Sequence, residues 1–171
     1  MKKNNKKFFL QDNSGVSIVE LLVIIAIVAI LSGAAVNLFG YLNGKQARQC
    51  AYKLEAAISE IRMETMSKSD GEPDSVYLEV VNEDDKIYAK RMIKGTEAKD
   101  LIGEKVSVFA IDTTGAENMI SSGTYVRVFF NRATGALLKE AAHPQFKIVQ
   151  GNTTYIVAIE PTTGRISCER Q

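Results

Sequence analysis

GVSIVELLVIIAIVAILSGAAV, residues 15–36, is the stretch of sequence on which the prediction of the fold depends. From Val16 to Val36 it has 21 residues, and only Glu20 among them has an ionisable side chain. A helix of this length spans roughly 30 Å, about the thickness of the hydrocarbon core of a bilayer. The stretch is therefore predicted to be a membrane-spanning helix.

Glu20 is the exception within this apolar stretch. A carboxylate inside a bilayer costs on the order of 2.5–3.5 kcal/mol, so an acid at this depth is expected to have a function and a partner. The alternative is a charge without a function, reaching to the membrane surface from an ordinary signal anchor. Small residues nearby, such as Ala26, Ala29 and Gly33, allow helices to approach closely.

Residues 1–15, MKKNNKKFFLQDNSG, form a basic segment with four lysines and one aspartate. Such a segment before a hydrophobic one stays on the cytoplasmic side of the membrane. A secretory signal peptide is the alternative, with residues 32–35 as its small-residue cleavage site. Glu20 would interrupt the apolar core of that signal, and the helical pattern continues past Ala35. Both observations count against a secretory signal.

This combination resembles the N-terminus of type IV prepilins and type II secretion pseudopilins. These proteins have a basic leader, a Gly, a hydrophobic residue, three more residues, a Glu and an apolar helix, and residues 2–36 follow that pattern. The resemblance implies cleavage after Gly15 by a prepilin peptidase on the cytoplasmic face, and N-methylation of the new terminus at Val16. Val16 stands where the family usually has Phe. Glu20 matches the family's Glu at the fifth mature position.

The position of Glu20 has a physical rationale in a filament of such subunits. After cleavage, the amine of Val16 is a cation at the edge of the apolar layer. Glu20 of one subunit can meet the Val16 amine of its neighbour, in a dry environment where Coulomb attraction is large. A subunit alone in the bilayer lacks that partner, so the pair is expected to favour assembly in register.

The helix is predicted to continue beyond the membrane, from about Val16 to Lys68, where Gly71 and Pro73 end it. Small and apolar residues recur at three- and four-residue spacing, with charged residues on the other faces, which indicates an amphipathic helix. This stripe consists of Ala47, Cys50, Ala51, Leu54, Ile58, Ile61 and Thr65.

Three glycines, Gly33, Gly40 and Gly44, lie in the middle of this predicted helix. Each costs roughly 1 kcal/mol relative to Ala in a helix interior. They indicate either close packing between helices or a segment that unwinds locally when a subunit enters a filament. The resemblance to pilins implies the second interpretation.

After Pro73 the hydrophobic pattern changes to a period of two, which is typical of strands. Strands are expected at 75–81, 86–93, 105–111, 125–131, 136–139, 145–149, 153–159 and 165–168, with turn residues between them. Residues 94–104, KGTEAKDLIGE, are expected to form a surface loop or a short helix. Residues 131–135 and 160–164 both end in Thr-Gly and are interpreted as similar hairpin loops.

The predicted fold is therefore α+β, with a long N-terminal helix packed on an antiparallel β-sheet head, as in the lollipop shape of pilins. The predicted parts are a cleaved leader (1–15), a transmembrane or filament-core helix (16–37), its amphipathic continuation (38–70) and a β-rich head (71–171).

The end of the sequence carries a second resemblance, to the GspH/FimT type of minor pseudopilin over residues 125–171. In DNA-binding members of that group a Gly-Arg-x-Arg tail is implicated. Arg165 matches the first arginine, but Ser167 stands where the second would be. Arg165 is thus a candidate DNA contact, and solvated surface charge is the alternative for Arg165 and Arg170, because phosphate binding needs several cations.

The two cysteines, Cys50 and Cys168, are both predicted to face the core. In a head outside the cytoplasm they could form a disulfide, which would be worth about 4–5 kcal/mol in the chain-entropy model. The alternative is two separate buried thiols. Two cysteines with a single histidine are not a usual set of metal ligands.

The sequence predicts neither an enzyme nor a cofactor. His143 is the only histidine, and no nucleophile motif or phosphate-binding glycine loop accompanies it. Glu83, Asp84 and Asp85 could hold a calcium ion, although acids in a turn are usually just solvated. The leader carries +3 of a total charge of +1, so the remaining side chains sum to −2. That balance argues against a basic nucleic-acid-binding protein.

Three functions remain open at this point. The first is a structural subunit of a type IV pilus or type II secretion-like filament, namely a pilin or pseudopilin that is expected to be a minor one. Its partners would be other pilin or pseudopilin subunits, prepilin peptidase, the membrane and the assembly platform. The second is a DNA- or ligand-binding minor pilin of a competence or uptake filament. The third is a membrane-anchored head that never polymerises. The first two imply a single-pass membrane protein with its head outside, which then joins a surface or periplasmic filament.

Overall fold

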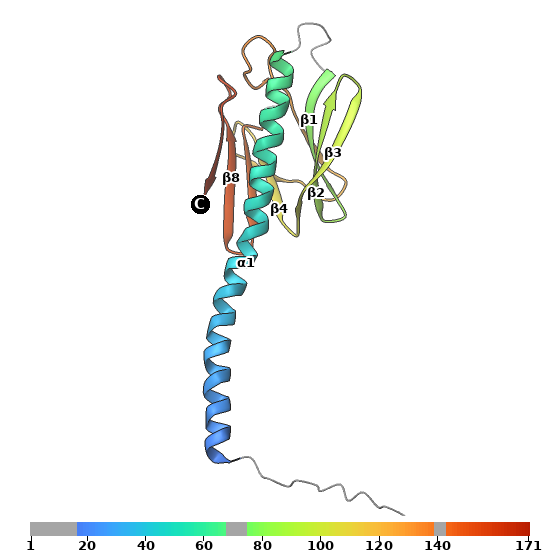
Figure 1. The fold of residues 1–171 in the computed structure, drawn as a ribbon. Coiled ribbons are helices and arrows are strands. Elements are labelled where there is room, and N and C mark those ends of the chain that lie inside the picture. The colour runs from blue at the N-terminus through green and yellow to red at the C-terminus, as the bar shows by residue number, and fades with distance from the viewer. Residues whose placement is uncertain (1–16, 68–74, 139–142) are drawn as a thin grey trace, which may run out of the picture. The chain divides into compact units, whose positions relative to one another are not determined.

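The computed structural model describes residues 17–67, 75–138 and 143–171, and it leaves out the side chains of residues 33–43. The chain divides into two compact units, Met1–Phe39 and Gly40–Gln171. We call the second the head unit. The helix α1 (Ile18–Ser67) contributes residues to both units (Figure 1). Its expected ends, Val16 and Lys68, lie outside the described residues.

The strands of the head unit form two antiparallel sheets. Sheet A has the order β3-β2-β1-β6 and consists of β1 (Val76–Glu83), β2 (Lys86–Ile93), β3 (Thr96–Glu104) and β6 (Tyr125–Val128). Sheet B has the order β5-β4-β7-β8-β9 and consists of β4 (Ser107–Ile111), β5 (Glu117–Met119), β7 (Gln145–Gln150), β8 (Thr153–Ile159) and β9 (Ile166–Arg170). The α+β class and the antiparallel pairing are confirmed, but the head has two sheets where one was expected.

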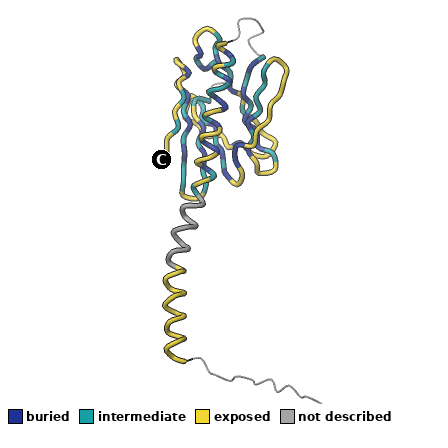
Figure 2. The backbone as a smooth tube through the Cα atoms, in the orientation of Figure 1, coloured by how far each residue is buried: buried dark blue, intermediate teal, exposed yellow. Residues whose placement is uncertain are grey.

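One hydrophobic core joins α1 to both sheets. Every member of the predicted stripe on α1, from Ala47 to Thr65, is buried (Figure 2). Leu78 of sheet A and Phe146 and Ile148 of sheet B are fully buried in the same cluster. The alternation along β8 follows from this arrangement, because its buried residues are every second one.

The expectation of a loop or short helix at residues 94–104 was wrong, because Thr96–Glu104 is the strand β3. A two-residue turn at Lys94 and Gly95, with φ of 51° and 78°, connects it to β2 as in a tight hairpin. Most of its side chains are exposed, so the strand forms through its pairing with β2 and without a regular apolar alternation.

Smaller parts of the head unit also differ from the predicted strand pattern or add to it. Of the strand expected at 136–139, the described residues form only an isolated bridge between Phe130 and Leu137. The three-residue strand β5 was not predicted, and all of its residues are exposed. The turn between β1 and β2 is confined to Asp84 and Asp85, which have φ of 52° and 60°.

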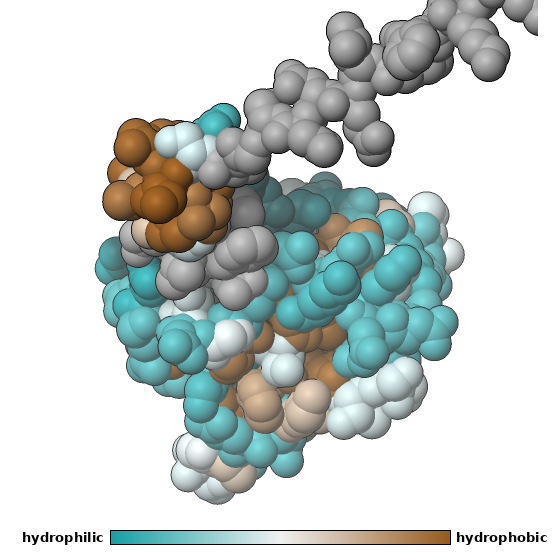
Figure 3. All heavy atoms as spheres, turned by 90° about the horizontal axis from the view of Figure 1, so that it is seen from below, coloured by the Kyte–Doolittle hydropathy of each residue, from teal (hydrophilic) through white to brown (hydrophobic). Residues whose placement is uncertain are grey.

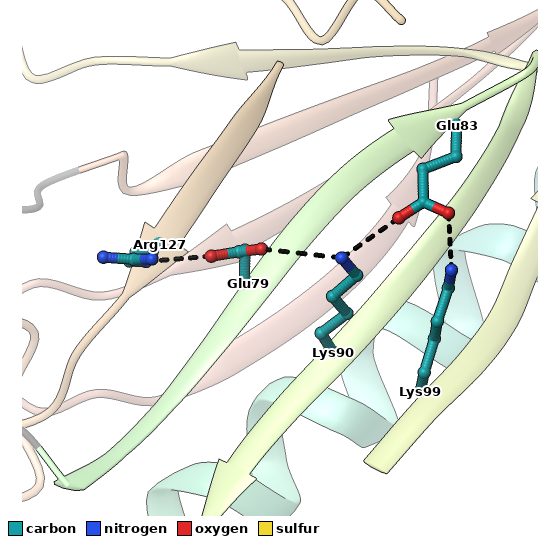
Figure 4. A network of polar contacts seen from close by, with 5 residues as sticks. All are labelled: Glu79, Glu83, Lys90, Lys99 and Arg127. Carbon is teal, nitrogen blue, oxygen red and sulfur yellow. Dashed lines mark hydrogen bonds and ion pairs between the residues drawn. The ribbon is translucent and has the colours of Figure 1, made fainter. Parts of the chain in front are cut away.

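A chain of ion pairs crosses all four strands of sheet A (Figure 4). Glu79 on β1 accepts from Arg127 on β6 at 2.9 Å and lies 4.0 Å from Lys90 on β2. Lys90 lies 3.0 Å from Glu83 on β1, which also pairs with Lys99 on β3 at 2.5 Å. The contacts from Lys99 and Lys90 lower the pKa of Glu83. The edge strand β3 is thereby tied to the rest of its sheet.

The two loops that end in Thr-Gly have the same closure. The N–H of Gly135 donates to the carbonyl of Asn131, and the N–H of Gly164 donates to that of Glu160, both at 2.7 Å. Each glycine has positive φ, 67° and 65° respectively. The expected similarity of these two loops therefore extends to their backbone geometry.

Arg62 on α1 holds these two loops together. Its Nε donates to the carbonyl of Gly135 at 3.0 Å, and its Nη2 donates to the carbonyl of Thr163 at 2.9 Å. A Cβ placed on Gly164 would lie 1.8 Å from the carbonyl oxygen of Gly135. The loops thus touch through backbone atoms, and only glycine fits at position 164.

Candidate functional site

The N-terminal part of α1 exposes apolar side chains on all of its faces. Eleven large aliphatic residues between Ile18 and Leu31 are 49–82% exposed. Figure 2 shows this segment as continuously exposed, and Figure 3 shows its hydrophobic side chains gathered together. A helix that is hydrophobic all round is normally covered by lipid or by other apolar helices. The segment therefore needs a partner that the isolated chain does not supply.

Glu20 is the one charged residue between Ile18 and Ser32, and it lies in the first turn of α1. Its side chain is exposed among the aliphatic ones, and among the described residues it has no hydrogen bond or ion pair. A negative charge in the first turn is favourable toward the helix dipole. Once the segment is covered by an apolar environment, Glu20 needs a cationic or hydrogen-bonding partner.

Ser17 begins this helix, a role that the sequence reasoning missed. Its carbonyl accepts from the N–H of Leu21 at 3.0 Å, and its Oγ accepts from the N–H of Val19 at 3.3 Å. The signal was present in the sequence, because Ser17-x-x-Glu20 has the spacing of a capping box. Ser17 thus fixes where the helix starts relative to Glu20. The predicted cleavage residues Gly15 and Val16 lie outside the described residues.

The structure keeps Cys50 and Cys168 apart as free thiols, so the bridged alternative is not what it shows. Cys50 is fully buried, and its Sγ would lie 2.8 Å from a Cβ added at Gly103. Cys168 is half-buried on β9. Burial raises the pKa of its thiol, and the negative charge of Glu55 raises it further. Cys50 and Glu55 are five positions apart on α1 and so lie on different sides of the helix. Cys50 belongs to the core cluster, and Cys168 packs against that cluster from β9.

Arg165 is exposed and lies directly before the last strand, β9. It lines a pocket of about 520 Å³ between α1 and the 160–164 loop, together with Ser59, Arg62, Met63, Thr163, Gly164 and Ile166. Arg62 already donates to two backbone carbonyls there. The structure thus places Arg62 beside Arg165, but the guanidinium of Arg62 is already hydrogen-bonded to carbonyls of the two loops.

The acidic cluster is divided between a strand and a turn. Glu83 is paired with lysines on sheet A, whereas Asp84 and Asp85 form the adjacent turn. Within the described ranges, no three histidine, cysteine, aspartate or glutamate side chains are grouped as metal ligands. The Nδ1 atom of His143 is buried and has no hydrogen-bond partner among the described residues.

Two further findings concern membrane-spanning helices and similarity to known proteins. In the part of the chain that the structure describes, no helix is both long and apolar enough to cross a membrane. Comparisons with family models, curated proteins and solved structures found no match.

Proposed function

We propose that this chain is a structural subunit of a type IV pilus or type II secretion-like filament. In this proposal a prepilin peptidase removes residues 1–15, and the subunit assembles through the N-terminal part of α1. The observation that carries the proposal is Glu20, a single charge in the first turn of a helix segment whose other large side chains are exposed aliphatics.

The exposed aliphatic residues show that the segment needs a cover, but they do not distinguish lipid from protein. Burying one such side chain is worth about 1.5–3 kcal/mol in either environment. Glu20 makes the distinction, because lipid offers no partner for a carboxylate and a neighbouring subunit offers the amine of Val16. In sequence the apolar run continues to Val36, beyond the last described side chain of the segment at Ser32.

The proposal extends to the arrangement and location of the subunit. We propose a lollipop-shaped pilin or pseudopilin, whose helix anchors it in the membrane with the head outside before assembly. Its partners would be other pilin or pseudopilin subunits, prepilin peptidase and the assembly platform. The α+β class and the two antiparallel sheets of the head unit are compatible with this arrangement.

Intact mass spectrometry of the chain recovered from cells tests the proposal. We expect a mass that begins at Val16 and carries one added methyl group. Gly15→Leu is the matched control, which should keep the leader. A chain that retains residues 1–15, or that begins after Ala34, would contradict the proposal.

DNA binding is the second candidate function, and it depends on Arg165. The arginine next to it in the pocket is already bound to carbonyls of two loops, which leaves few free cations for phosphate. The structural-subunit function is therefore preferred. Salt-dependent retention of DNA that is lost in Arg165→Ala would favour the second function instead.

A further inference from the structure

Each sheet of the head unit ends in an edge strand that is long enough to accept a further strand. β3 is the outer strand of sheet A, and β9 is the outer strand of sheet B. Figure 1 shows them on opposite sides of the head unit and running in the same direction. Unpaired strand edges are templates for pairing with another chain.

The backbone groups that are free on β3 can be identified from its hydrogen bonds. The side chain of Lys53 donates to the carbonyl of Leu101 at 3.1 Å, so this carbonyl points away from β2. Backbone groups alternate in direction along a strand, so Glu97, Lys99 and Leu101 all present their N–H and C=O groups at the open edge.

The free groups on β9 follow in the same way. Gln171 donates its N–H to the carbonyl of Thr154, and Glu160 donates its N–H to the carbonyl of Arg165. Odd-numbered residues of this strand therefore bond to β8. The open edge presents the N–H and C=O groups of residues 166, 168 and 170.

We propose that β9 of one copy of this chain adds to β3 of the next copy as a parallel strand. The parallel direction rests on the proposed function, because subunits of one filament point the same way. In a parallel pair, a residue whose backbone groups point at the partner lies opposite one whose groups point away. Lys99 then lies opposite an odd-numbered residue of β9. In this pairing the α1 helices of the two copies also stay on the same side of the joined sheet.

Charge selects one register among those that the backbone allows. With Lys99 opposite Glu169 of the next copy, Asp100 lies opposite Arg170 of the next copy, so both pairs are of opposite charge. A shift of two residues one way would place Glu97 opposite Glu169 and create a like-charge pair. A shift the other way would leave Glu169 opposite the apolar Leu101. Cross-strand pairs of opposite charge stabilise a sheet and like charges destabilise it.

The charges on the β9 side are available for this contact. Glu169 and Arg170 are exposed and have no ion pair among the described residues. On the β3 side, Lys99 pairs with Glu83, and the exposed Asp100 pairs with Arg91, which is mostly buried and also pairs with Glu60. A lysine has three donors and a carboxylate has two oxygens, so each can take a second partner.

There is also room beside β3 for another strand. Its first residues, from Thr96 to Leu101, are exposed. A groove between α1 and β3 contains two adjoining pockets of about 310 and 300 Å³, which share Lys53, Leu101 and Ile102. The hydrogen bond from Lys53 to Leu101 spans this groove and would be exchanged for one from the added strand. The contact joins two different surfaces, so it cannot close as a two-fold dimer, and it generates an open polymer when the rotation between copies does not close a ring.

A cysteine cross-link tests this contact in the full-length chain. In the selected register Ala98 lies opposite Cys168 of the next copy. Neighbouring strands are about 4.8 Å apart, within the Cα separation that a disulfide needs. We therefore expect Ala98→Cys to form a ladder of dimers, trimers and larger species after mild oxidation of the full-length chain. The control Glu97→Cys places its thiol on the other face of β3 and should not cross-link.

Charge reversal provides the second arm of the test. In the Ala98→Cys background, Glu169→Lys should lower the cross-linked fraction roughly two- to fivefold, and Lys99→Glu combined with Glu169→Lys should restore it. Adding Cys168→Ser should abolish the ladder. Restoration by the double reversal would support the register, and its failure would overturn it.

Sedimentation of filaments, measured on the same samples, separates this inference from the proposed function. Filaments without a ladder would overturn the strand pairing and leave the proposed function intact. A ladder without filaments would support the pairing and count against the proposed function. If neither filaments nor a cross-linked ladder formed, the proposed strand pairing would also be overturned.

Discussion

Gly164→Ala is expected to destabilise the head unit because the contact between the two Thr-Gly loops leaves no space for a side chain. The new Cβ would lie 1.8 Å from the carbonyl oxygen of Gly135 and 2.7 Å from Nε of Arg62. The first neighbour is a backbone atom, which cannot move without moving its loop. Gly151→Ala is the matched control, because Gly151 also has positive φ, 56°, but nothing lies within 4 Å of its added Cβ.

Both substitutions place a residue with a Cβ in a left-handed conformation, but only Gly164→Ala also overpacks its surroundings. A left-handed conformation costs a residue with a Cβ roughly 1–2 kcal/mol. Overpacking adds typically 1–3 kcal/mol when the neighbours must shift. We therefore expect Gly151→Ala to lower the free energy of unfolding by about 1 kcal/mol and Gly164→Ala by about 3 kcal/mol.

Urea unfolding of the full-length chain in a mild detergent measures both values. The chain has six tyrosines and no tryptophan, so tyrosine emission and circular dichroism are suitable signals. The midpoint should fall further for Gly164→Ala at an unchanged slope. Equal losses for the two variants would refute the reasoning, because they would show that the loops do not touch as described.

Two further predictions concern α1 and the cysteines. Arg62→Met keeps an apolar stem but removes both donors to the loops, so the free energy of unfolding should fall by about 1–2 kcal/mol in the same assay; an unchanged midpoint would show that water replaces these bonds. Burial raises the pKa of Cys50 to about 12, so iodoacetamide should label only Cys168 in the folded chain. Equal labelling of both thiols, measured by peptide mass spectrometry, would contradict the described packing.

The sequence predicted helices and strands correctly where a single hydrophobic periodicity dominated a segment. The stripe from Ala47 to Thr65 has the 3.6-residue repeat of a helix with one buried face, and every member is buried. The strand at 153–159 was predicted with the bounds that β8 has, because its apolar residues alternate between the core and the surface. Local patterning of this kind depends only on neighbouring residues, so it can be recognised without the fold.

Features that depend on pairing between distant segments were not recognisable in this way. β3 lacks a regular apolar alternation because it is an exposed edge strand, and the Lys94-Gly95 turn before it is not one of the common hairpin dipeptides. Sheet A includes β6 through its pairing with β1, and the paired residues of these two strands are 44 to 50 positions apart in the sequence. Nor could the sequence show whether Cys50 and Cys168 are bridged, and the structure has both as free thiols.

The candidate site was partly recognisable from the sequence. Glu20 stands out by composition alone, as the one acid in an apolar run. Ser17 was missed because a serine before a hydrophobic helix is common, and its capping role became visible only through its bonds to Val19 and Leu21. What covers the exposed aliphatic residues lies outside this chain, and under the proposed function it is the helices of neighbouring copies.

The incorporation of Glu20→Ala into filaments tests the central claim most directly. The fraction of this variant in sedimented filaments is compared with that of the unsubstituted chain, and intact masses confirm equal membrane insertion and cleavage. Removing the acid leaves the neighbour's amine unpaired in a dry environment, so we expect incorporation to fall at least about tenfold. Incorporation equal to that of the unsubstituted chain would contradict the claim that Glu20 pairs with another subunit.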